Sequence, residues 1–271
     1  MKKLSHYLRW AVAVGVTAVS AMAATAPARA ADLLDTVKAR GTLLVGMEGT
    51  YPPFNFVNTK TGQLDGFDVD VAKLIAQKLG VKVKFVKTEW SAILAGLSAG
   101  KFDVIINQVG ITPQREKTFD FSVPYVASSP QLILRKDDPA HYKSFADLKG
   151  KTLGVGQGSN YETLAKAQKG VIVKSYPGAP EYLSDLIDHR IDAALNDQLM
   201  TAYLVKTSHL PIRGGAIVGE PKFNGIPFRK GNPKFKAALD KVLEASFKDG
   251  EFAKISDKWF GIDVSKVRKA G

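Results

Sequence analysis

Short apolar runs alternate along this chain with stretches in which apolar residues recur at helical spacing. Residues 42–46, 103–107 and 151–156 are apolar runs of strand length. Apolar positions three or four apart in residues 67–79 and 90–99 predict amphipathic helices between those strands. This alternation is typical of α/β architecture built from βαβ units.

Two distant segments carry the same pattern. Residues 100–107 and 189–196 each run through a basic residue, an apolar residue, Asp, a short apolar run and Asn. No third copy exists, which argues against a solenoid. We therefore predict two similar lobes, each a mixed sheet flanked by helices.

The C-terminal part predicts a helix that returns to the first lobe. Asn232 is the expected N-cap and Pro233 the first helical residue, and an apolar stripe then runs from Phe235 to Phe247. Such a return makes the chain cross between the lobes twice, near residues 126–130 and 219–224, and two crossings form a hinge.

These crossings fix the domain boundaries that we expect. Lobe 1 takes residues 31–126 together with 224–271, and lobe 2 takes residues 127–223. Residues 1–30 are set apart as a signal peptide: a basic start, a short apolar run at residues 10–24 and a small-x-small pattern at residues 28–30. The apolar run is shorter than the roughly 20 residues of a membrane-spanning helix.

Composition narrows the function. The formal charge is +12, and the first 30 residues hold four basic residues and no acid, so 12 − 4 leaves +8 for the remainder. Basic residues are scattered among acids without a nucleic-acid motif, so we expect no nucleic-acid partner. The chain has no cysteine, which excludes disulfides and a thiol nucleophile.

No motif of catalysis or metal binding stands out. The histidines lack metal-ligand spacing, and neither a Walker loop nor a His-Glu-x-x-His motif occurs. We therefore predict no catalytic residue, no metal and no cofactor. Glycines 154, 156 and 158 lie between a strand and a helix. They suit a small carboxylate held by backbone N–H groups, or equally a plain turn capped by Ser159.

Two charged residues follow predicted strands, where ligands gather in open α/β sheets. Arg115 follows the strand at residues 103–107 and is suited to clamp a carboxylate through two hydrogen bonds. Asp197 follows the strand at residues 191–196 and can accept from an ammonium group. Each residue also has a simpler interpretation: Arg115 as a surface arginine and Asp197 as a helix N-cap. Together they match the two charged groups of an α-amino acid.

Several motifs, in order along the chain, resemble those of the periplasmic polar amino-acid-binding proteins of ABC importers. They are residues 46–54 (GMEGTYPPF), 66–70 (GFDVD), 111–115 with 121–125 (ITPQR, FSVPY), 156–161 (GQGSNY) and 258–261 (KWFG). The resemblance covers the chain beyond residue 30. Residues 48–54, 106–109 and 258–261 are most similar to the cystine-binding branch.

The resemblance implies a role for each site residue. Arg115 binds the α-carboxylate, together with the backbone N–H groups of Gly110 and Asn160. Asp197 binds the α-ammonium group, together with the backbone carbonyl of Gln108. Many relatives have Ser or Thr at position 110, so glycine removes a hydroxyl contact to the ammonium group.

The remaining site residues contact the ligand side chain. Tyr51 and Trp90 sandwich its aliphatic part, although an aromatic core position is the plainer reading of each. Glu48 and Ser159 line the side-chain end of the site and help to set specificity.

The resemblance thus implies a monomeric periplasmic protein of the two-lobed type II binding-protein fold. The resemblance implies that it captures a small polar amino acid, with cystine as the favoured ligand, and delivers it to the membrane subunits of an ABC transporter. Glutamine or a basic amino acid is the alternative ligand. Exported cyclohexadienyl dehydratases share the fold, but Asp197 favours a binder because prephenate has no amino group. A sensor domain would need an anchor or an attached kinase.

Overall fold

The computed structural model describes residues 31–265, so the predicted signal peptide lies outside the described part. The helices are α1 (Leu33–Arg40), α2 (Phe67–Lys78), α3 (Trp90–Ser98), α4 (Pro113–Glu116), η1 (Phe145–Leu148), α5 (Asn160–Lys166), α6 (Ala179–Ile187), α7 (Gln198–Thr207), α8 (Pro233–Lys248) and α9 (Glu251–Phe260). The strands are β1 (Thr42–Met47), β2 (Thr50–Tyr51), β3 (Asn55–Val57), β4 (Leu64–Asp65), β5 (Lys82–Lys87), β6 (Val104–Ile105), β7 (Val109–Gly110), β8 (Phe119–Phe121), β9 (Val126–Ser128), β10 (Pro130–Arg135), β11 (Thr152–Gly156), β12 (Ile172–Tyr176), β13 (Ala193–Asp197), β14 (Ile212–Ile217), β15 (Lys222–Gly225) and β16 (Pro227–Arg229).

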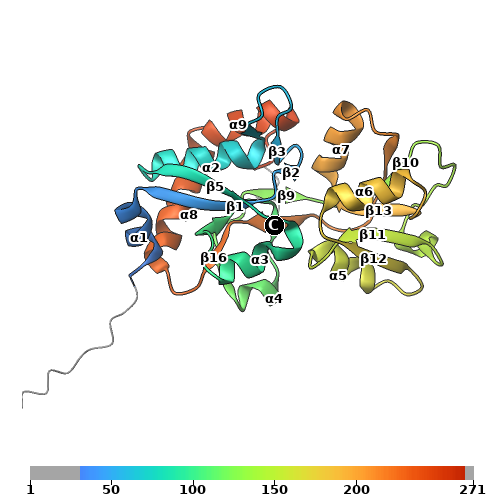
Figure 1. Ribbon diagram of the computed structural model, residues 1–271, viewed down its shortest axis with the longest axis horizontal. Coiled ribbons are helices and arrows are strands. Elements are labelled where there is room, and N and C mark those ends of the chain that lie inside the picture. Colours follow the sequence, from blue (N-terminus) through green and yellow to red (C-terminus); the bar gives the residue numbers. More distant parts are fainter. Residues whose placement is uncertain (1–30, 266–271) are drawn as a thin grey trace, which may run out of the picture. The chain divides into compact units, whose positions relative to one another are not determined.

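Two five-stranded sheets carry the fold, and helices flank each of them (Figure 1). The first has the strand order β5-β1-β6-β16-β8, and we call the part built on it lobe 1. The second has the order β12-β11-β13-β10-β14 and forms lobe 2. In each sheet the first three strands are parallel and the last two pair antiparallel. The predicted two-lobed α/β fold with mixed sheets is confirmed.

The repeated sequence pattern has a structural counterpart. Asp103 in lobe 1 accepts a 2.8 Å hydrogen bond from the backbone N–H of Leu44 in the neighbouring strand β1. Asp192 in lobe 2 accepts the equivalent bond, 2.7 Å long, from the backbone N–H of Thr152 at the start of β11. Each aspartate thus satisfies a backbone donor at the same point of its sheet.

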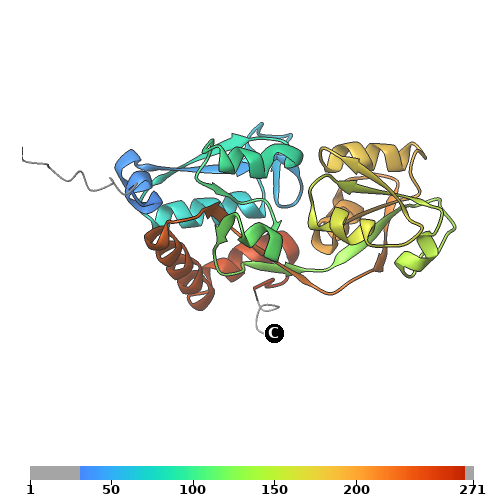
Figure 2. The same cartoon turned by 90° about the horizontal axis from the view of Figure 1, so that it is seen from below.

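Two antiparallel strands, β9 and β15, connect the lobes (Figure 2). Lys222 pairs with Ser128, and Asn224 pairs with Val126. The strand after each crossing becomes the fourth strand of the sheet it enters, which is β10 in lobe 2 and β16 in lobe 1. The crossings fall where the sequence predicts a hinge.

The start of the described chain is joined to α8 by exchanged caps. Asn232 occupies the N-cap position of α8, as predicted, but its side chain does not cap that helix. Its Oδ1 accepts from the backbone N–H of Leu33 at 2.7 Å. Asp32 in turn accepts 3.0 Å bonds from the backbone N–H groups of Lys234 and Phe235. Sequence reading missed this exchange because the two partners are about 200 positions apart.

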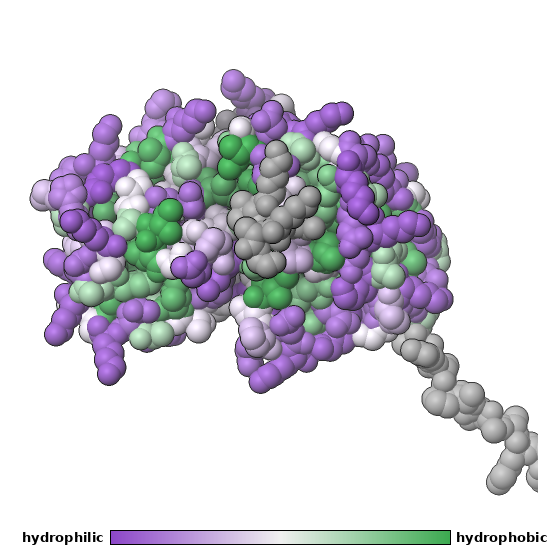
Figure 3. All heavy atoms as spheres, turned by 180° about the vertical axis from the view of Figure 1, so that it is seen from behind, coloured by the Kyte–Doolittle hydropathy of each residue, from purple (hydrophilic) through white to green (hydrophobic). Residues whose placement is uncertain are grey.

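The helices bury their apolar faces, as the predicted periodicity requires. In α2, Phe67, Val71 and Ile75 are fully buried. One face of the molecule carries mostly hydrophilic side chains, with separate apolar patches between them (Figure 3). Among residues 31–265, no helix combines the length and apolar character needed to cross a bilayer.

Candidate functional site

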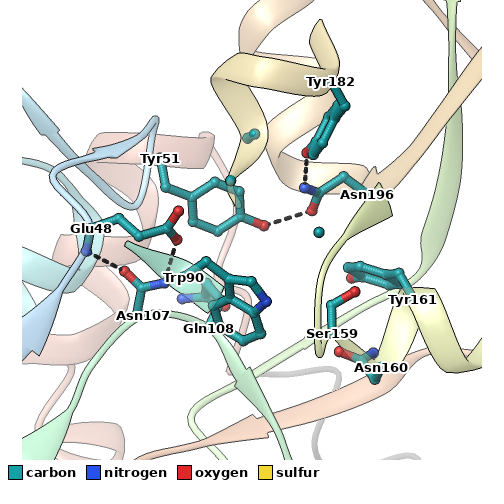
Figure 4. Close-up of a pocket in the computed structure, with 13 residues that line it drawn as sticks. Glu48, Tyr51, Trp90, Asn107, Gln108, Ser159, Asn160, Tyr161, Tyr182 and Asn196 are labelled. Atoms are coloured by element: carbon teal, nitrogen blue, oxygen red, sulfur yellow. Dashed lines mark hydrogen bonds between the residues drawn. The ribbon is translucent and has the colours of Figure 1, made fainter. Parts of the chain in front are cut away.

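A pocket lies between the two lobes and is lined by residues of both. It is lined by Glu48, Tyr51, Trp90, Asn107, Gln108, Gly156, Ser159, Asn160, Tyr161, Gly178, Ala179, Tyr182 and Asn196 (Figure 4). Six of the nine predicted site residues are in this lining. The other three, Gly110, Arg115 and Asp197, each bond to or pack against residues that line the pocket or its loops.

Arg115 connects loops of both lobes. Thr112 caps the short helix α4 that carries it. Its Nη1 donates to the carbonyl of Gly110 at 2.8 Å, and its Nη2 donates to the carbonyl of Gly158 in lobe 2 at 3.1 Å. The guanidinium carbon lies 5.6 Å from the ring centre of Trp90, a cation–π distance.

Within the described part of the chain, the charge of Arg115 has no carboxylate counter-ion. The side chain is buried and takes part in no ion pair within residues 31–265. Burial lowers its pKa to about 10, so the group remains charged at neutral pH. A guanidinium has five N–H donors, and the two carbonyls use two of them. Three donors can still bind an anion.

Gly110 lies against this arginine. A Cβ atom there would be 3.2 Å from Oδ1 of Asn160 and 3.5 Å from Nη1 of Arg115. The three residues named in the sequence for the α-carboxylate are therefore close together. A serine at position 110 would need Asn160 to shift by a few tenths of an ångström.

Asp197 is fully buried at the end of β13 and acts as the N-cap of α7. Its Oδ1 accepts from the backbone N–H of Leu199 at 2.7 Å and from the hydroxyl of Ser128 at 2.9 Å. Its Oδ2 lies 3.4 Å from the hydroxyl of Tyr161, which lines the pocket. Oδ1 of Asp197 therefore caps the helix, as the simpler interpretation predicts, while Oδ2 faces the pocket residue Tyr161. Burial raises the pKa of Asp197 to about 6.

Gln108 has left-handed backbone geometry, with φ 53°. Its Nε2 donates to Oδ1 of Asp68 at 2.7 Å, and its Oε1 accepts from Nδ2 of Asn224 in the crossing strand β15 at 3.0 Å. The side chain is therefore bonded to other protein groups. Of its polar groups, the backbone carbonyl is the one that the sequence assigns to a ligand.

Asp68 is a buried acid that the sequence analysis includes only as part of the motif at residues 66–70. It also accepts from the hydroxyl of Tyr125 at 3.0 Å and from Nδ2 of Asn55 at 3.3 Å. Burial raises its pKa to about 7. Within the described residues it has no cationic partner, so it adds negative potential beside the pocket.

Glu48 and Asn107 bind each other twice. The backbone N–H of Glu48 donates to Oδ1 of Asn107 at 2.9 Å, and Nδ2 of Asn107 donates to Oε2 of Glu48 at 2.7 Å. The strand predicted at residues 103–107 is shorter in the structure and spans Val104–Ile105. Burial raises the pKa of Glu48 to about 7, and nearby Glu181 and Asp68 add to the rise.

Tyr51 and Tyr182 meet at Asn196 from two sides (Figure 4). The hydroxyl of Tyr51 donates to Oδ1 of Asn196 at 2.7 Å, and Nδ2 of Asn196 donates to the hydroxyl of Tyr182. The first bond joins lobe 1 to lobe 2. Tyr51 and Tyr182 are thus aromatic groups with fixed hydroxyls on the pocket surface.

Sequence reading missed Asn107, Tyr161, Tyr182 and Asn196 as pocket residues. A signal existed for two of them, since Asn107 and Asn196 are the final positions of the repeated pattern. Tyr182 is a buried residue of α6, and its sequence context resembles that of an ordinary core position.

The glycine-containing loop before α5 matches the turn interpretation. The hydroxyl of Ser159 accepts from the backbone N–H of Glu162 at 3.0 Å, which caps the helix. The backbone N–H of Gly158 donates to Oε2 of Glu162 at 2.6 Å. The N–H of Asn160, at the first helical position, has no hydrogen-bond partner within residues 31–265. It is one of the donors that the family resemblance assigns to the α-carboxylate.

The described residues contain no cluster of three or more His, Asp or Glu side chains that could hold a metal ion. The pocket is instead lined by the carboxyl group of Glu48, amide groups and aromatic rings. Behind this lining, the guanidinium of Arg115 packs on Trp90, and the carboxyl groups of Asp197 and Asp68 bond to Tyr161 and Gln108. This set suits a small zwitterion with a polar side chain.

The model of the bacterial extracellular solute-binding proteins, family 3, matches residues 43–262. The chain therefore belongs to this family. It is 42% identical over 269 residues to the L-cystine-binding protein TcyJ of Escherichia coli, covering 97% of this chain and 100% of that protein. It is 40% identical over 240 residues to the L-cystine-binding protein TcyA of Bacillus subtilis, covering 88% of each.

The fold also matches solved structures of amino-acid-binding proteins. An ancestral arginine-binding protein bound to glutamine superposes with a TM-score of 0.76 at 41% identity, covering 82% of this chain and 99% of that one. The family and these relatives are binding proteins. The expectation of an amino-acid-binding protein of the ABC-importer type is confirmed at that level.

Proposed function

We propose that this chain captures one polar L-amino acid, L-cystine, between its lobes and delivers it to the membrane subunits of an ABC transporter. We further propose that it acts as a monomer in the periplasm after removal of residues 1–30. Its moving parts are then residues 31–126 with 224–271 and residues 127–223. The similarity to two L-cystine-binding proteins supports this ligand.

One observation carries the proposal: Arg115 and Asp197, opposite charges without an ion-pair partner within residues 31–265, contact Trp90 and Tyr161 in the lining of a single pocket. Arg115 supplies three unused N–H donors for an α-carboxylate, and the N–H of Asn160 adds a fourth. Asp197 accepts from the α-ammonium group, and the carbonyl of Gln108 is the second acceptor that the family resemblance implies. Burying a zwitterion without such partners would be costly.

The rest of the pocket contacts the ligand side chain. Tyr51 and Trp90 pack on its carbon and sulfur atoms, while Glu48 and Ser159 lie at its far end. Closure of the hinge brings these groups, which come from both lobes, around one molecule. Because the chain has no cysteine, it cannot exchange disulfides with cystine, and binding is reversible.

Isothermal titration calorimetry without reducing agent tests this function, after a thermal-shift screen of amino acids. We expect one L-cystine per chain with a micromolar or lower Kd, which corresponds to about −8 kcal/mol. Stronger binding of L-glutamine or L-arginine would show that L-cystine is not the ligand, but the protein would still be an amino-acid-binding protein. Turnover of prephenate by the purified protein would overturn the assignment as a binder.

A further inference from the structure

Two carboxylates from opposite lobes converge where Gly178 lines the pocket. Glu48 follows β1 in lobe 1, and Glu181 is in the first turn of α6 in lobe 2. A Cβ atom on Gly178 would be 3.3 Å from Oε1 of Glu48 and 3.2 Å from Oε2 of Glu181. The two oxygens are therefore no more than about 6.5 Å apart, the sum of 3.3 and 3.2 Å.

No basic side chain in the described part of the chain neutralises this pair. Neither glutamate is in an ion pair there. Glu48 is only 9% exposed, and its Oε2 accepts from Asn107. Its Oε1 has no hydrogen-bond partner within residues 31–265 and faces the Gly178 end of the pocket.

The pair depends on closure, because each lobe contributes one member. Two like charges at this separation repel each other, and the repulsion opposes closing of the lobes. A cation between them would replace one repulsion by two attractions. The other end of the pocket, with Arg115 and Asp197, already suits the α-carboxylate and α-ammonium groups.

We propose that Glu181 and Glu48 form a second-cation subsite that selects amino acids with a positive group at the far end of the side chain. This inference rests on the proposed function and deepens it. The second ammonium group of L-cystine and the guanidinium group of L-arginine both have this chemistry. L-glutamine has none, so it would leave the two carboxylates unneutralised on closure.

Glu181→Gln tests the subsite, because Glu181 is exposed in this structure and the change preserves its size. Glu220→Gln is the matched control, since Glu220 is an exposed carboxylate of the loop before β15 that does not line the pocket. Calorimetry compares L-cystine, L-arginine and L-glutamine on the wild type and both variants. Thermal unfolding verifies that each variant is folded.

We expect Glu181→Gln to weaken L-cystine binding about tenfold and to leave L-glutamine binding no weaker. Glu220→Gln should change neither. If L-arginine loses affinity equally, the subsite accepts any second cation. If only L-cystine loses affinity, the subsite is specific for an ammonium group. Unchanged L-cystine affinity in Glu181→Gln overturns the subsite but keeps the proposed function. A wild type that binds no amino acid overturns both.

Discussion

The hydroxyl of Tyr51 in lobe 1 donates a 2.7 Å hydrogen bond to Oδ1 of Asn196 in lobe 2. Asn196 also receives the backbone N–H of Asp197 at 2.6 Å. The asparagine therefore links a lobe-1 ring to the residue that we assign to the α-ammonium group. Ligand recognition and lobe contact share this one side chain.

Tyr51→Phe should weaken ligand binding without unfolding the protein. The change removes a bond between the lobes but keeps the ring, and Oδ1 of Asn196 keeps its bond from Asp197. A lost hydrogen bond of this kind costs about 1 kcal/mol, or roughly fivefold in Kd by calorimetry. Tyr203→Phe is the control, because that lobe-2 ring faces Phe56 of lobe 1 outside the pocket. Equal effects of the two changes would refute a specific role for the Tyr51 hydroxyl.

Arg115→Ala should nearly abolish binding. The α-carboxylate loses a charged clamp, at a cost of about 3 kcal/mol or roughly 100-fold in Kd. Arg213→Ala is a matched control, since Arg213 also donates to two backbone carbonyls, those of Asp138 and Ala140, away from the pocket. Near-normal amino-acid affinity in the Arg115 variant, measured by calorimetry, would contradict the assigned role.

Asp197→Asn separates ligand binding from helix capping. Asparagine caps helices about as well as aspartate, so α7 and the thermal unfolding temperature should change little. The ammonium group loses its charged acceptor, and we expect affinity to fall by about 1.5–3 kcal/mol, roughly 10- to 150-fold. A role limited to capping predicts the opposite result, in which calorimetry gives wild-type affinity.

Affinity for L-cystine should fall as the pH decreases through about 7. The pKa of Glu48 is raised to about 7 by burial, and a ligand cation beside it favours the ionised form, so binding releases a proton. Affinity is then highest above pH 7 and falls by at most tenfold per pH unit below it. Titrations from pH 8 to 6 check this, and Glu48→Gln should remove the fall near pH 7 but keep the part near pH 6 that comes from Asp197, whose burial raises its pKa to about 6. A wild-type profile as flat as that of the variant would show that Glu48 does not contact a cation.

Sequence patterns predicted most of the architecture because the apolar periodicity of each element reflects burial in one lobe. The strands β1 and β11 and the helices α2, α3 and α8 follow from such local patterns. The exchanged caps of Asp32 and Asn232 were not predictable, since they depend on two residues brought together only by the fold.

The site was predicted less completely, for a related reason. Arg115 and Asp197 stand out as charges at strand ends, whereas Tyr182 has the pattern of an ordinary core residue. Asp68 did not stand out in the sequence because its hydrogen-bond partners, Gln108, Tyr125 and Asn55, lie elsewhere in the chain. The closeness of Glu48 and Glu181 likewise arises only when the lobes meet.

A crystal structure of the protein grown with L-cystine tests the central claim most directly. The account predicts density for one molecule between the lobes, with its α-carboxylate on the guanidinium group of Arg115 and its α-ammonium group on Asp197. Density for the ligand in the reverse orientation, or bound outside this pocket, would contradict it.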